Sequence, residues 1–335
     1  MDLLDEISSI GAQVEFLIEK YLISNTSEEF KEVVLHQVKA GGKRIRPALV
    51  ILSCKACNGR IEDVFPVAAA MELIHNYSLI FDDIIDRGEL RRGKPTTRKR
   101  YGDTMAILAA IHYREAITEA LNNSKNSIRL HKLVAETIKA LVEGERLDVL
   151  FEQTGRNDEY IAKHRRQYVS INEYIEMVKC KTGALLKACC MAGAIVADAK
   201  EDFINALGSY GINIGIAFQV ADDIIDLFGE ERKIGKKVGK DIIEHKLGNI
   251  VLLLYVKNFP NEANIIFNTL RRDYVDYNDV VKIIEILESK GVKEEAYSFG
   301  LSYVKKAKES LKILPDTDAK QTLLKLADLI LYREY

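Results

Sequence analysis

The chain has 335 residues, of which 47% are hydrophobic and 29% charged, and its formal net charge is −2. This is the profile of a soluble globular protein with a large core, and the small net charge argues against nucleic acid as a partner. Five cysteines, an odd and sparse number, favour a reducing compartment, and the acidic N-terminus lacks a signal-peptide pattern, so we expect a cytoplasmic protein without a membrane span.

Helical periodicity runs through nearly the whole chain, and strand-like alternation is almost absent. Connections are short, and Pro47 and Pro66 fit first-turn positions of helices. We therefore expect one all-α domain that spans residues 1–335. The predicted helices are 3–21, 27–39, 47–57, 64–87, 103–122, 127–152, 171–197, 200–228, 241–257, 261–272, 278–290, 293–313 and 317–333.

Two stretches, the predicted helix 64–87 and residues 212–221, are apolar nearly all round. A helix of this kind is buried centrally in its domain. Both of these buried helices end in a cluster of aspartates. Buried apolar walls with charge at one end predict a deep apolar pocket with a charged mouth, which fits a substrate that has a hydrocarbon tail and a phosphorylated head.

The pentapeptide Asp-Asp-Ile-Ile-Asp occurs at residues 82–86 and again at residues 222–226. Helix positions i, i+3 and i+4 lie about 5–6 Å apart on one face, so each copy gathers carboxylates that repel one another. A divalent cation offsets that repulsion, and carboxylates with few other ligands suit Mg²⁺, which keeps waters and recruits substrate phosphates. A single copy could be a solvated helix end, but two copies that end buried helices predict a pair of facing metal sites.

Two basic loops accompany the first aspartate cluster. The segment RGELRRGKPT follows the cluster directly and presents Arg91 and Arg92, whose fixed forks suit phosphate. The earlier segment GGKRIRP precedes a helix start and offers Lys43 and Arg46 to an anion, because flexible glycine backbone and a helix N-terminus both favour negative charge. The Arg91-Arg92 pair alone could be ordinary surface charge, but its place directly after the cluster predicts phosphate binding. For GGKRIRP, an anion site and a turn between helices with incidental charge both remain open.

Three lysines are further candidates for point-charge contacts to phosphate. They are Lys181, Lys236 and Lys246. Lys236 belongs to a loop rich in Gly and Lys soon after the second cluster, and such a loop could close over a diphosphate.

One Glu-x-x-His unit, Glu72 to His75, resembles the repeat of di-iron helical bundles. A di-iron site needs two such units, and the sequence holds no second copy, so we reject this interpretation. His75 still shares nearly one helical face with Asp82 and Asp86, because offsets of seven and eleven residues return to the same side of a helix.

These motifs together resemble the short-chain trans-polyprenyl diphosphate synthases, the family of farnesyl and geranylgeranyl diphosphate synthases. The resemblance runs from about residue 41 to about residue 250 and is closest to the archaeal-type geranylgeranyl synthases. It implies a single-domain, isoprenoid-synthase-type helical bundle around a deep central cavity, with the aspartate clusters on opposite walls. It also implies a homodimer.

The resemblance further implies roles for individual residues. About three Mg²⁺ ions would bridge the clusters to an allylic diphosphate, with Asp82, Asp86 and Asp222 as ligands and Asp83, Asp223 and Asp226 as ligands or as support for them. Arg91, Lys181 and Lys236 match positions that hold the allylic diphosphate. Lys43, Arg46, His75 and Arg92 match those that hold isopentenyl diphosphate, and Gln219 and Lys246 match further contacts near the allylic diphosphate.

The implied reaction is the head-to-tail condensation of isopentenyl diphosphate with dimethylallyl, geranyl or farnesyl diphosphate. In the family, residues four and five before the first cluster form the pocket floor, and here these are Ser78 and Tyr77. At 1.5 Å per residue, Ser78 lies about 6 Å and Met71 about 16 Å below Asp82. The aromatic Tyr77 implies a C20 product, and C15 or C25 remain alternatives.

The sequence departs from the family pattern at Ala110-Ile111, where Gly-Asp is usual, and at Glu145, where Gln is frequent. It departs again at His245 and Gly248, around Lys246. None of these changes removes a proposed metal ligand. Two other functions share the fold, a terpene cyclase and a non-catalytic subunit of a heteromeric prenyl synthase, but two intact clusters and GGKRIRP favour the synthase.

Overall fold

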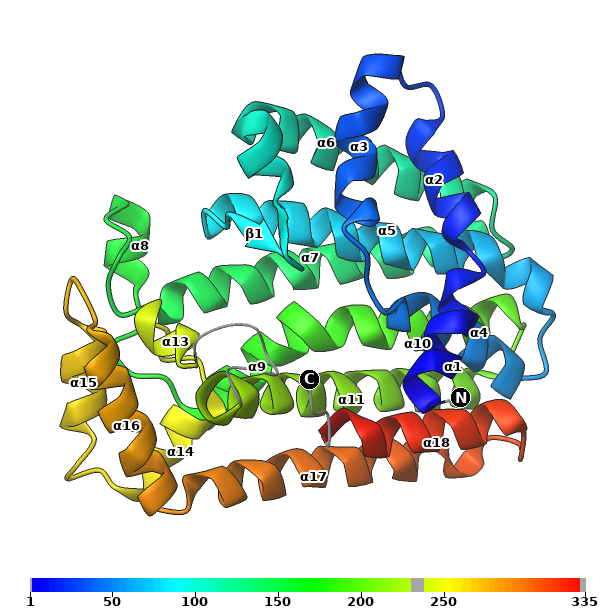
Figure 1. Cartoon of the computed structure of the whole chain (residues 1–335). Coiled ribbons are helices and arrows are strands. Elements are labelled where there is room, and N and C mark those ends of the chain that lie inside the picture. Colours follow the sequence, from blue (N-terminus) through cyan, green and yellow to red (C-terminus); the bar gives the residue numbers. More distant parts are fainter. Residues whose placement is uncertain (1, 230–237, 332–335) are drawn as a thin grey trace. The chain divides into compact units, whose positions relative to one another are not determined.

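The computed structural model describes residues 2–229 and 238–331 and consists mainly of helices (Figure 1). The all-α prediction is confirmed, since the sheet within the described part of the chain is one hairpin of two-residue strands. In chain order the elements are α1 (Leu3–Ala12), α2 (Glu15–Ile23), α3 (Glu28–Lys39), α4 (Ile45–Ala56), α5 (Ile61–Ile85), β1 (Leu90–Arg91), β2 (Lys94–Pro95), α6 (Thr97–Asn122), α7 (Ser127–Phe151), α8 (Glu159–His164), α9 (Ile171–Val178), the π-helix η1 (Lys179–Gly183), α10 (Ala184–Val196), α11 (Glu201–Phe228), α13 (Lys240–Ile243), α14 (Ile250–Asn258), α15 (Asn264–Leu270), α16 (Tyr277–Ser289), α17 (Val292–Ser310), the 3₁₀ helix η2 (Leu311–Ile313) and α18 (Asp318–Leu331).

The chain forms two compact units, which we describe separately. Unit 1 comprises the residues up to 139, together with 185–211 and 310–326. Unit 2 comprises residues 140–184, 212–309 and those from 327 onward. Each unit contains one of the two aspartate clusters.

Unit 1 is built around α5, which packs against α4 and along α6 (Figure 1). Most of α5 is buried, including Met71 and Ile74 without exposed surface, as its apolar sequence requires. By length and composition α5 could also cross a membrane, but 61% of its most apolar window is buried within the structure, as in the core helix of a soluble protein.

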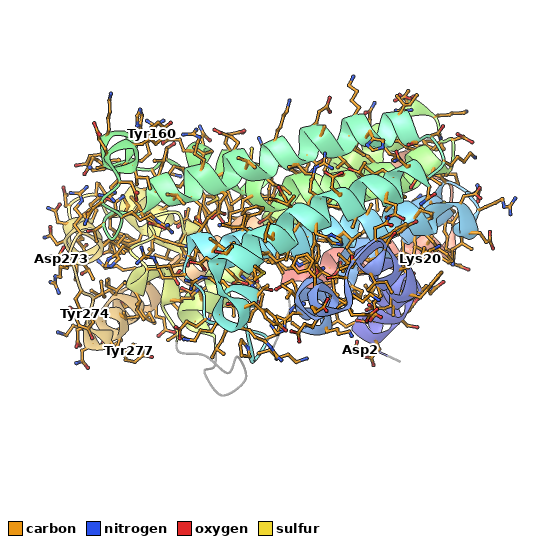
Figure 2. The ribbon with its side chains drawn as sticks, turned by 90° about the horizontal axis from the view of Figure 1, so that it is seen from above. Asp2, Lys20, Tyr160, Asp273, Tyr274 and Tyr277 are labelled. Atoms are coloured by element: carbon orange, nitrogen blue, oxygen red, sulfur yellow. The ribbon has the colours of Figure 1, made fainter. Side chains whose placement is uncertain are left out.

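Unit 2 has a second apolar core, in which α14 packs against α9 and α16. Tyr174 of α9 is fully buried, and Tyr255 of α14 is 1% exposed. The turn between α15 and α16 brings Asp273, Tyr274 and Tyr277 to the outside (Figure 2). The α9 helix begins with a capping box, in which Ser170 and Glu173 each bond the other's backbone nitrogen.

Most predicted helices are confirmed to within about three residues, and the differences have local causes. The predicted helix 3–21 is split at Gln13 and Val14, because the backbone of Val14 leaves the helical region. The predicted helix 241–257 is split into α13 and α14, because Asn249 accepts a hydrogen bond from the Val251 nitrogen and starts a new helix. The prediction that Pro66 lies in a first turn was wrong, since α5 begins at Ile61.

The predicted helices also missed α8 and the β1–β2 hairpin. The hairpin turns at Arg92 and Gly93, whose φ angles are +52° and +74°. Positive φ at both central residues is the geometry of a type I′ turn, which suits the twist of two short antiparallel strands. Thr96 follows the hairpin and accepts a hydrogen bond from the Lys99 nitrogen, which starts α6.

Candidate active site

The first aspartate cluster lies at the C-terminal end of α5. Asp82 is half-buried and Asp86, the residue that ends the helix, is exposed, whereas Asp83 between them is only 4% exposed. The Asp83 carboxylate accepts three hydrogen bonds of 2.8–3.1 Å from the guanidinium of Arg91. Such a two-pronged pair fixes Arg91 more firmly than a single contact would.

The hairpin explains how Arg91 reaches Asp83. The Thr96 hydroxyl donates to the carbonyl of Gly88, and the Gly88 nitrogen donates to the carbonyl of Asp83 at 2.9 Å. These bonds fold the basic segment back against the end of α5. Arg91, which the sequence predicts to bind phosphate, is thus in direct contact with the first cluster through Asp83.

The loop GGKRIRP lies at the start of α4 in the same unit. Lys43 is exposed and Arg46 is half-buried, while Arg44 between them is 7% exposed and starts α4 with a φ of +49°. The Arg44 guanidinium donates to Glu15 at 2.5 Å and to Glu72 at 3.2 Å.

His75 lies near this loop, one turn after Glu72 on α5. Although the imidazole keeps some exposure, burial and the nearby Arg46 and Arg92 hold the pKa of His75 well below its usual value. At neutral pH the ring is therefore uncharged. Three of the residues predicted to bind isopentenyl diphosphate, Arg46, Arg92 and His75, are thus brought together within unit 1, with a neutral His75 among cations.

The second aspartate cluster lies near the end of α11 in unit 2. Asp222 and Asp226 are half-buried, and Asp223 between them is 2% exposed. Asp223 accepts hydrogen bonds from the Tyr174 hydroxyl at 2.7 Å and from the Ile250 nitrogen at 2.9 Å.

Further hydrogen bonds fix the second cluster to its surroundings. Gln219, one turn earlier on α11, donates to Asp223 at 2.9 Å and accepts from the Thr182 hydroxyl at 3.0 Å. The two carboxylate oxygens of Asp226 each accept 3.1 Å hydrogen bonds from the backbone nitrogens of Lys240 and Asp241. The cluster is thus held in place by α9, η1, α13 and α14.

The ionised form of the aspartates is disfavoured at this second cluster. Burial raises the pKa of Asp223, Asp226 and Asp241, and the charge of Asp241 adds to the rise at the first two. The pKa of Asp226 reaches about 7. Such a site stabilises a bound cation, because the cation favours the ionised carboxylates that burial disfavours.

Two of the predicted phosphate-binding lysines lie on either side of one buried carboxylate. Asp148 of α7 is 7% exposed, and one of its oxygens lies 2.6 Å from the ammonium of Lys181 and 3.4 Å from that of Lys246. Glu145 lies 2.8 Å from Lys181, and Glu244 lies 3.4 Å from Lys246. Burial acts against the ionised form of Asp148, but the two lysines outweigh it, so the pKa of Asp148 lies below its usual value.

Lys181 lies in η1, a single π-helical turn between α9 and α10. Such turns cost backbone stability and recur at functional sites. Gly144 of α7 makes room for this turn, because a Cβ atom at residue 144 would overlap the backbone nitrogen of Lys181. The close approach of the two backbones brings Lys181 within reach of Asp148.

Lys236, the remaining predicted phosphate lysine, lies outside the described residues.

The residues predicted to set the chain length of the product lie on α5. Met71 is fully buried, while Tyr77 and Ser78 are half-buried. The Tyr77 ring meets that of Phe81 edge to face at 5.1 Å, and the Ser78 hydroxyl donates to the carbonyl of His75. Their role as a floor stays a prediction.

These donor groups suit Mg²⁺, which keeps waters and substrate phosphates as ligands, better than they suit a metal that protein side chains bind alone. Within residues 2–229 and 238–331, no three His, Cys, Asp or Glu side chains are close enough together to hold a metal ion by themselves. Mg²⁺ is usually bound through one or two carboxylates, waters and substrate phosphates, so pairs such as Asp82 with Asp86 suit it.

Three residues that organise these sites have no role in the motifs of the sequence. They are Arg44, Asp148 and Tyr174. Arg44 stands between Lys43 and Arg46, and Asp148 lies three residues after Glu145, so their places in the sequence were a usable signal. Tyr174 is remote in sequence from Asp223, and nothing in its local pattern indicates the contact.

A helical chain with two aspartate clusters, and with cations held by buried carboxylates, has the architecture of a trans-prenyltransferase. A sequence profile of the polyprenyl synthetase family matches residues 27–287. The chain belongs to this family and is a trans-prenyltransferase enzyme.

Curated relatives match over essentially the whole chain. The short chain isoprenyl diphosphate synthase of Methanothermobacter thermautotrophicus is 35% identical, with 100% of both chains covered. The geranylgeranyl diphosphate synthase of Methanosarcina mazei is 33% identical, over 100% of this chain and 99% of that one. The geranylfarnesyl diphosphate synthase of Aeropyrum pernix is 32% identical, over 95% and 99%.

Solved structures share the fold. The geranylgeranyl pyrophosphate synthetase of Pyrococcus horikoshii superimposes with a TM-score of 0.89 at 34% identity, with 99% of each chain covered. A polyprenyl synthase from Caulobacter crescentus, complexed with calcium and isoprenyl diphosphate, gives 0.88 at 28% identity, over 100% of this chain and 98% of that one.

Replacing Gly144 by alanine should lower the melting temperature, because the new methyl group would push η1 away from α7. Overpacking of this kind costs about 1–3 kcal/mol. The control is Gly183→Ala, whose methyl group meets the side chain of Ile212 at 3.2 Å and its carbonyl oxygen at 3.4 Å. Thermal unfolding followed by circular dichroism measures both, and equal melting temperatures would contradict the close approach that we describe.

Proposed function

We propose that the protein is a geranylgeranyl diphosphate synthase, which condenses isopentenyl diphosphate with dimethylallyl, geranyl or farnesyl diphosphate. The observation that carries the proposal is the pairing of phosphate-binding cations with buried carboxylates, Arg91 with Asp83 and Lys181 and Lys246 with Asp148. Cations held in fixed positions are what a diphosphate site requires, because little order is then lost when the substrate binds.

The proposed roles fall on residues of both units. Asp82, Asp86, Asp222 and Asp226 would hold the divalent metal, while Asp83 and Asp223 act mainly through the partners that they hold. Lys181 and Arg91, with Gln219 and Lys246, would bind the allylic diphosphate, and Lys236 would join them. Lys43, Arg46, Arg92 and the neutral His75 would bind isopentenyl diphosphate. We further propose that the chain is one domain that spans residues 1–335.

The cations would orient the allylic diphosphate and stabilise the charge that develops on it as its C–O bond breaks. Bound divalent metal supplies additional stabilisation of that leaving group. Apolar side chains of α5 would exclude water from the allylic carbocation. The double bond of isopentenyl diphosphate then attacks, and a proton is lost from the new chain to the departed diphosphate.

The metal is proposed to be Mg²⁺, with about three ions per site. The aspartate oxygens are hard ligands that suit Mg²⁺ and Ca²⁺ alike. Calcium in the Caulobacter crescentus structure supports a divalent cation with such ligands. We also propose that the protein is cytoplasmic, which fits its five free cysteines.

Purified protein with Mg²⁺, isopentenyl diphosphate and each of the three allylic diphosphates should yield a C20 product. Dephosphorylated products separated by chromatography give the chain length. The control is Asp222→Ala, which should reduce the rate by about 100-fold or more through loss of leaving-group stabilisation. A wild-type protein that elongates none of the three substrates would refute the proposal.

Product length is expected to depend on Tyr77. Replacement of Tyr77 by alanine removes a ring from one face of α5 and should yield products longer by one or more C5 units. The control is Leu79→Ala, on the other side of the helix, which should leave product length unchanged. If the Tyr77→Ala variant still makes a product of the wild-type length, the floor of the pocket lies elsewhere.

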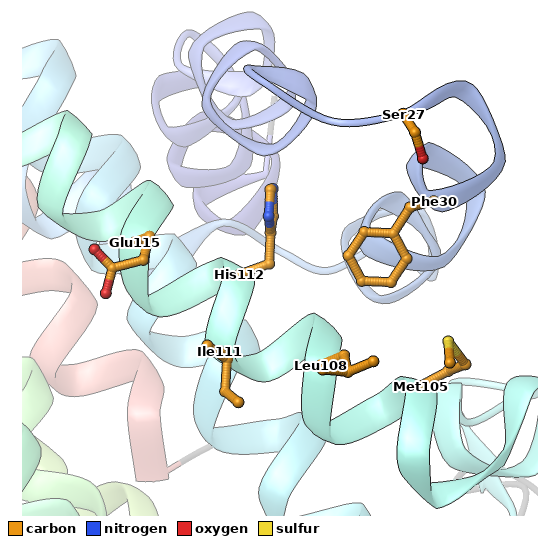
Figure 3. Close-up of a pocket in the computed structure, with 7 residues that line it drawn as sticks. All are labelled: Ser27, Phe30, Met105, Leu108, Ile111, His112 and Glu115. Carbon is orange, nitrogen blue, oxygen red and sulfur yellow. The ribbon is translucent and has the colours of Figure 1, made fainter.

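We propose that the protein is a homodimer that uses the exposed side of α6. Ile107, Leu108 and Ile111 on this helix are 42%, 45% and 55% exposed. They adjoin a surface pocket of about 450 Å³ between α3 and α6, where Phe30 and His112 face each other (Figure 3). Ile111 stands where the family usually has Asp, so this face is more apolar than the family pattern requires. A second copy of the chain is the partner that would cover it.

Sedimentation velocity should give wild-type protein twice the chain mass of 37.8 kDa. Ile111→Glu should shift the protein towards the monomer, because it places a charge within the apolar contact. The control is Ile313→Glu, since Ile313 is 53% exposed but lies on η2. A wild-type monomer, or an equal effect of both substitutions, would exclude this dimer.

A further inference from the structure

Arg44 stands between two residues proposed to bind isopentenyl diphosphate, yet its side chain turns inward. Lys43 is exposed, whereas Arg44 is 7% exposed. The φ angle of +49° at Arg44 places its backbone in the left-handed region, which is unfavourable for a residue other than glycine. The contacts of the side chain must therefore hold this conformation.

Those contacts join four segments of unit 1. The guanidinium donates to Glu15 of α2 at 2.5 Å and to Glu72 of α5 at 3.2 Å. It also donates to the carbonyls of Val38, near the end of α3, at 3.1 Å and of Gly41, in the loop, at 3.3 Å. Burial acts to lower the pKa of Arg44, but Glu15 and Glu72 outweigh it, so the pKa is raised and the guanidinium stays charged.

Glu72 is the buried counterpart of this arginine. It is 2% exposed, and one of its oxygens accepts hydrogen bonds from Arg44 and from the Asn76 amide. Its charge also interacts with Arg46 and Arg92. One carboxylate thus faces three guanidinium groups, and without it their mutual repulsion would be uncompensated in a partly buried place.

The backbone of the loop lies against two of these guanidinium groups. Gly42 has a φ of +148°, and a Cβ atom at this position would come within 2.7 Å of Arg92 and 2.9 Å of Arg44. Arg92 comes from the hairpin turn, so the hairpin and the loop meet at this point. Arg44 and Arg92 therefore both lie against the backbone of Gly42, which directly precedes Lys43.

We infer that Arg44 and Glu72 form a positioning pair, which holds Lys43, Arg46 and Arg92 in place to receive isopentenyl diphosphate. The pair acts through these neighbours and does not itself touch the substrate. This inference rests on the proposed function, because it assigns the pair to one of the two substrates of that reaction.

Two conservative substitutions test the pair in the full-length enzyme. Arg44→Lys keeps the charge but loses the fork that joins the segments. Glu72→Gln keeps the shape but loses the charge. Each should raise KM for isopentenyl diphosphate about tenfold, equivalent to about 1.4 kcal/mol. The kcat and the KM for the allylic diphosphate should change less than about threefold, and this split is what a merely structural role would not produce.

The control for general destabilisation is Tyr210→Phe. Tyr210 is fully buried, and its hydroxyl donates to the carbonyl of Leu323 at 2.7 Å, remote in sequence from the loop and the hairpin. This substitution should lower the melting temperature without separating the two KM values. If Tyr210→Phe raised KM for isopentenyl diphosphate alone, the split would not be specific to the pair and the inference would fail.

The double variant tests whether the two residues act together. Because each single substitution already breaks the pair, Arg44→Lys with Glu72→Gln should raise KM for isopentenyl diphosphate no more than the larger single effect. If the KM of the double variant instead rose by the product of the two single effects, the residues would contribute independently and the pairing would be overturned.

Calorimetric titration of isopentenyl diphosphate into the wild-type enzyme separates this inference from the proposed function. Binding and elongation by wild type, with weaker binding by both single variants, support the pair. If wild type elongates but the variants keep its KM for isopentenyl diphosphate, the inference alone fails. A wild type that neither binds isopentenyl diphosphate nor elongates any allylic substrate overturns both.

Discussion

Asp148 lies buried between the ammonium groups of Lys181 and Lys246, and Asp83 lies buried in the fork of Arg91. A buried charge without a partner costs several kcal/mol, so each carboxylate requires its cations and each cation is fixed by its carboxylate. The backbone adapts to these pairs, with a type I′ turn that brings in Arg91 and a π-helical turn that carries Lys181. The need to compensate these buried charges therefore also fixes where the three cations lie.

The same pairs influence how a diphosphate would bind. Lys181 faces both Asp148 and Glu145, and Glu145 stands where the family often has an uncharged Gln. An arriving diphosphate must share this lysine with two carboxylates, which lowers the net attraction but keeps the ammonium in place. Preorganisation reduces the order lost on binding, and divalent metal adds the positive charge that the carboxylates remove. The affinity of this site for a diphosphate would thus depend on how firmly Lys181 is held in place and on how much positive charge remains around it.

Local sequence was sufficient for the fold class and for the residues of the clusters, because helical periodicity and the Asp-Asp-Ile-Ile-Asp spacing are short-range signals. It was insufficient where a contact joins distant segments. Tyr174 reaches Asp223 across 49 residues, and Asp148 reaches Lys181 across 33. The split of the predicted helix 241–257 has the same cause, since Asn249 bonds the Asp241 side chain and the backbone of Asp223. Periodicity carries no information about partners of this kind.

The two aspartate motifs show why three carboxylates are needed in each. Successive residues on a helix are turned by about 100°, so the second aspartate cannot share the face of the first and fifth. In both motifs the second is the buried one, Asp83 at 4% and Asp223 at 2% exposed, and each is hydrogen-bonded within the protein. The first and fifth keep more exposed surface, and we propose that they bind metal. The spacing would then serve two purposes, since the buried carboxylate fixes the end of its helix while the other two would face the substrate. Loss of the buried aspartate would remove the support of the site even where both proposed metal ligands remained.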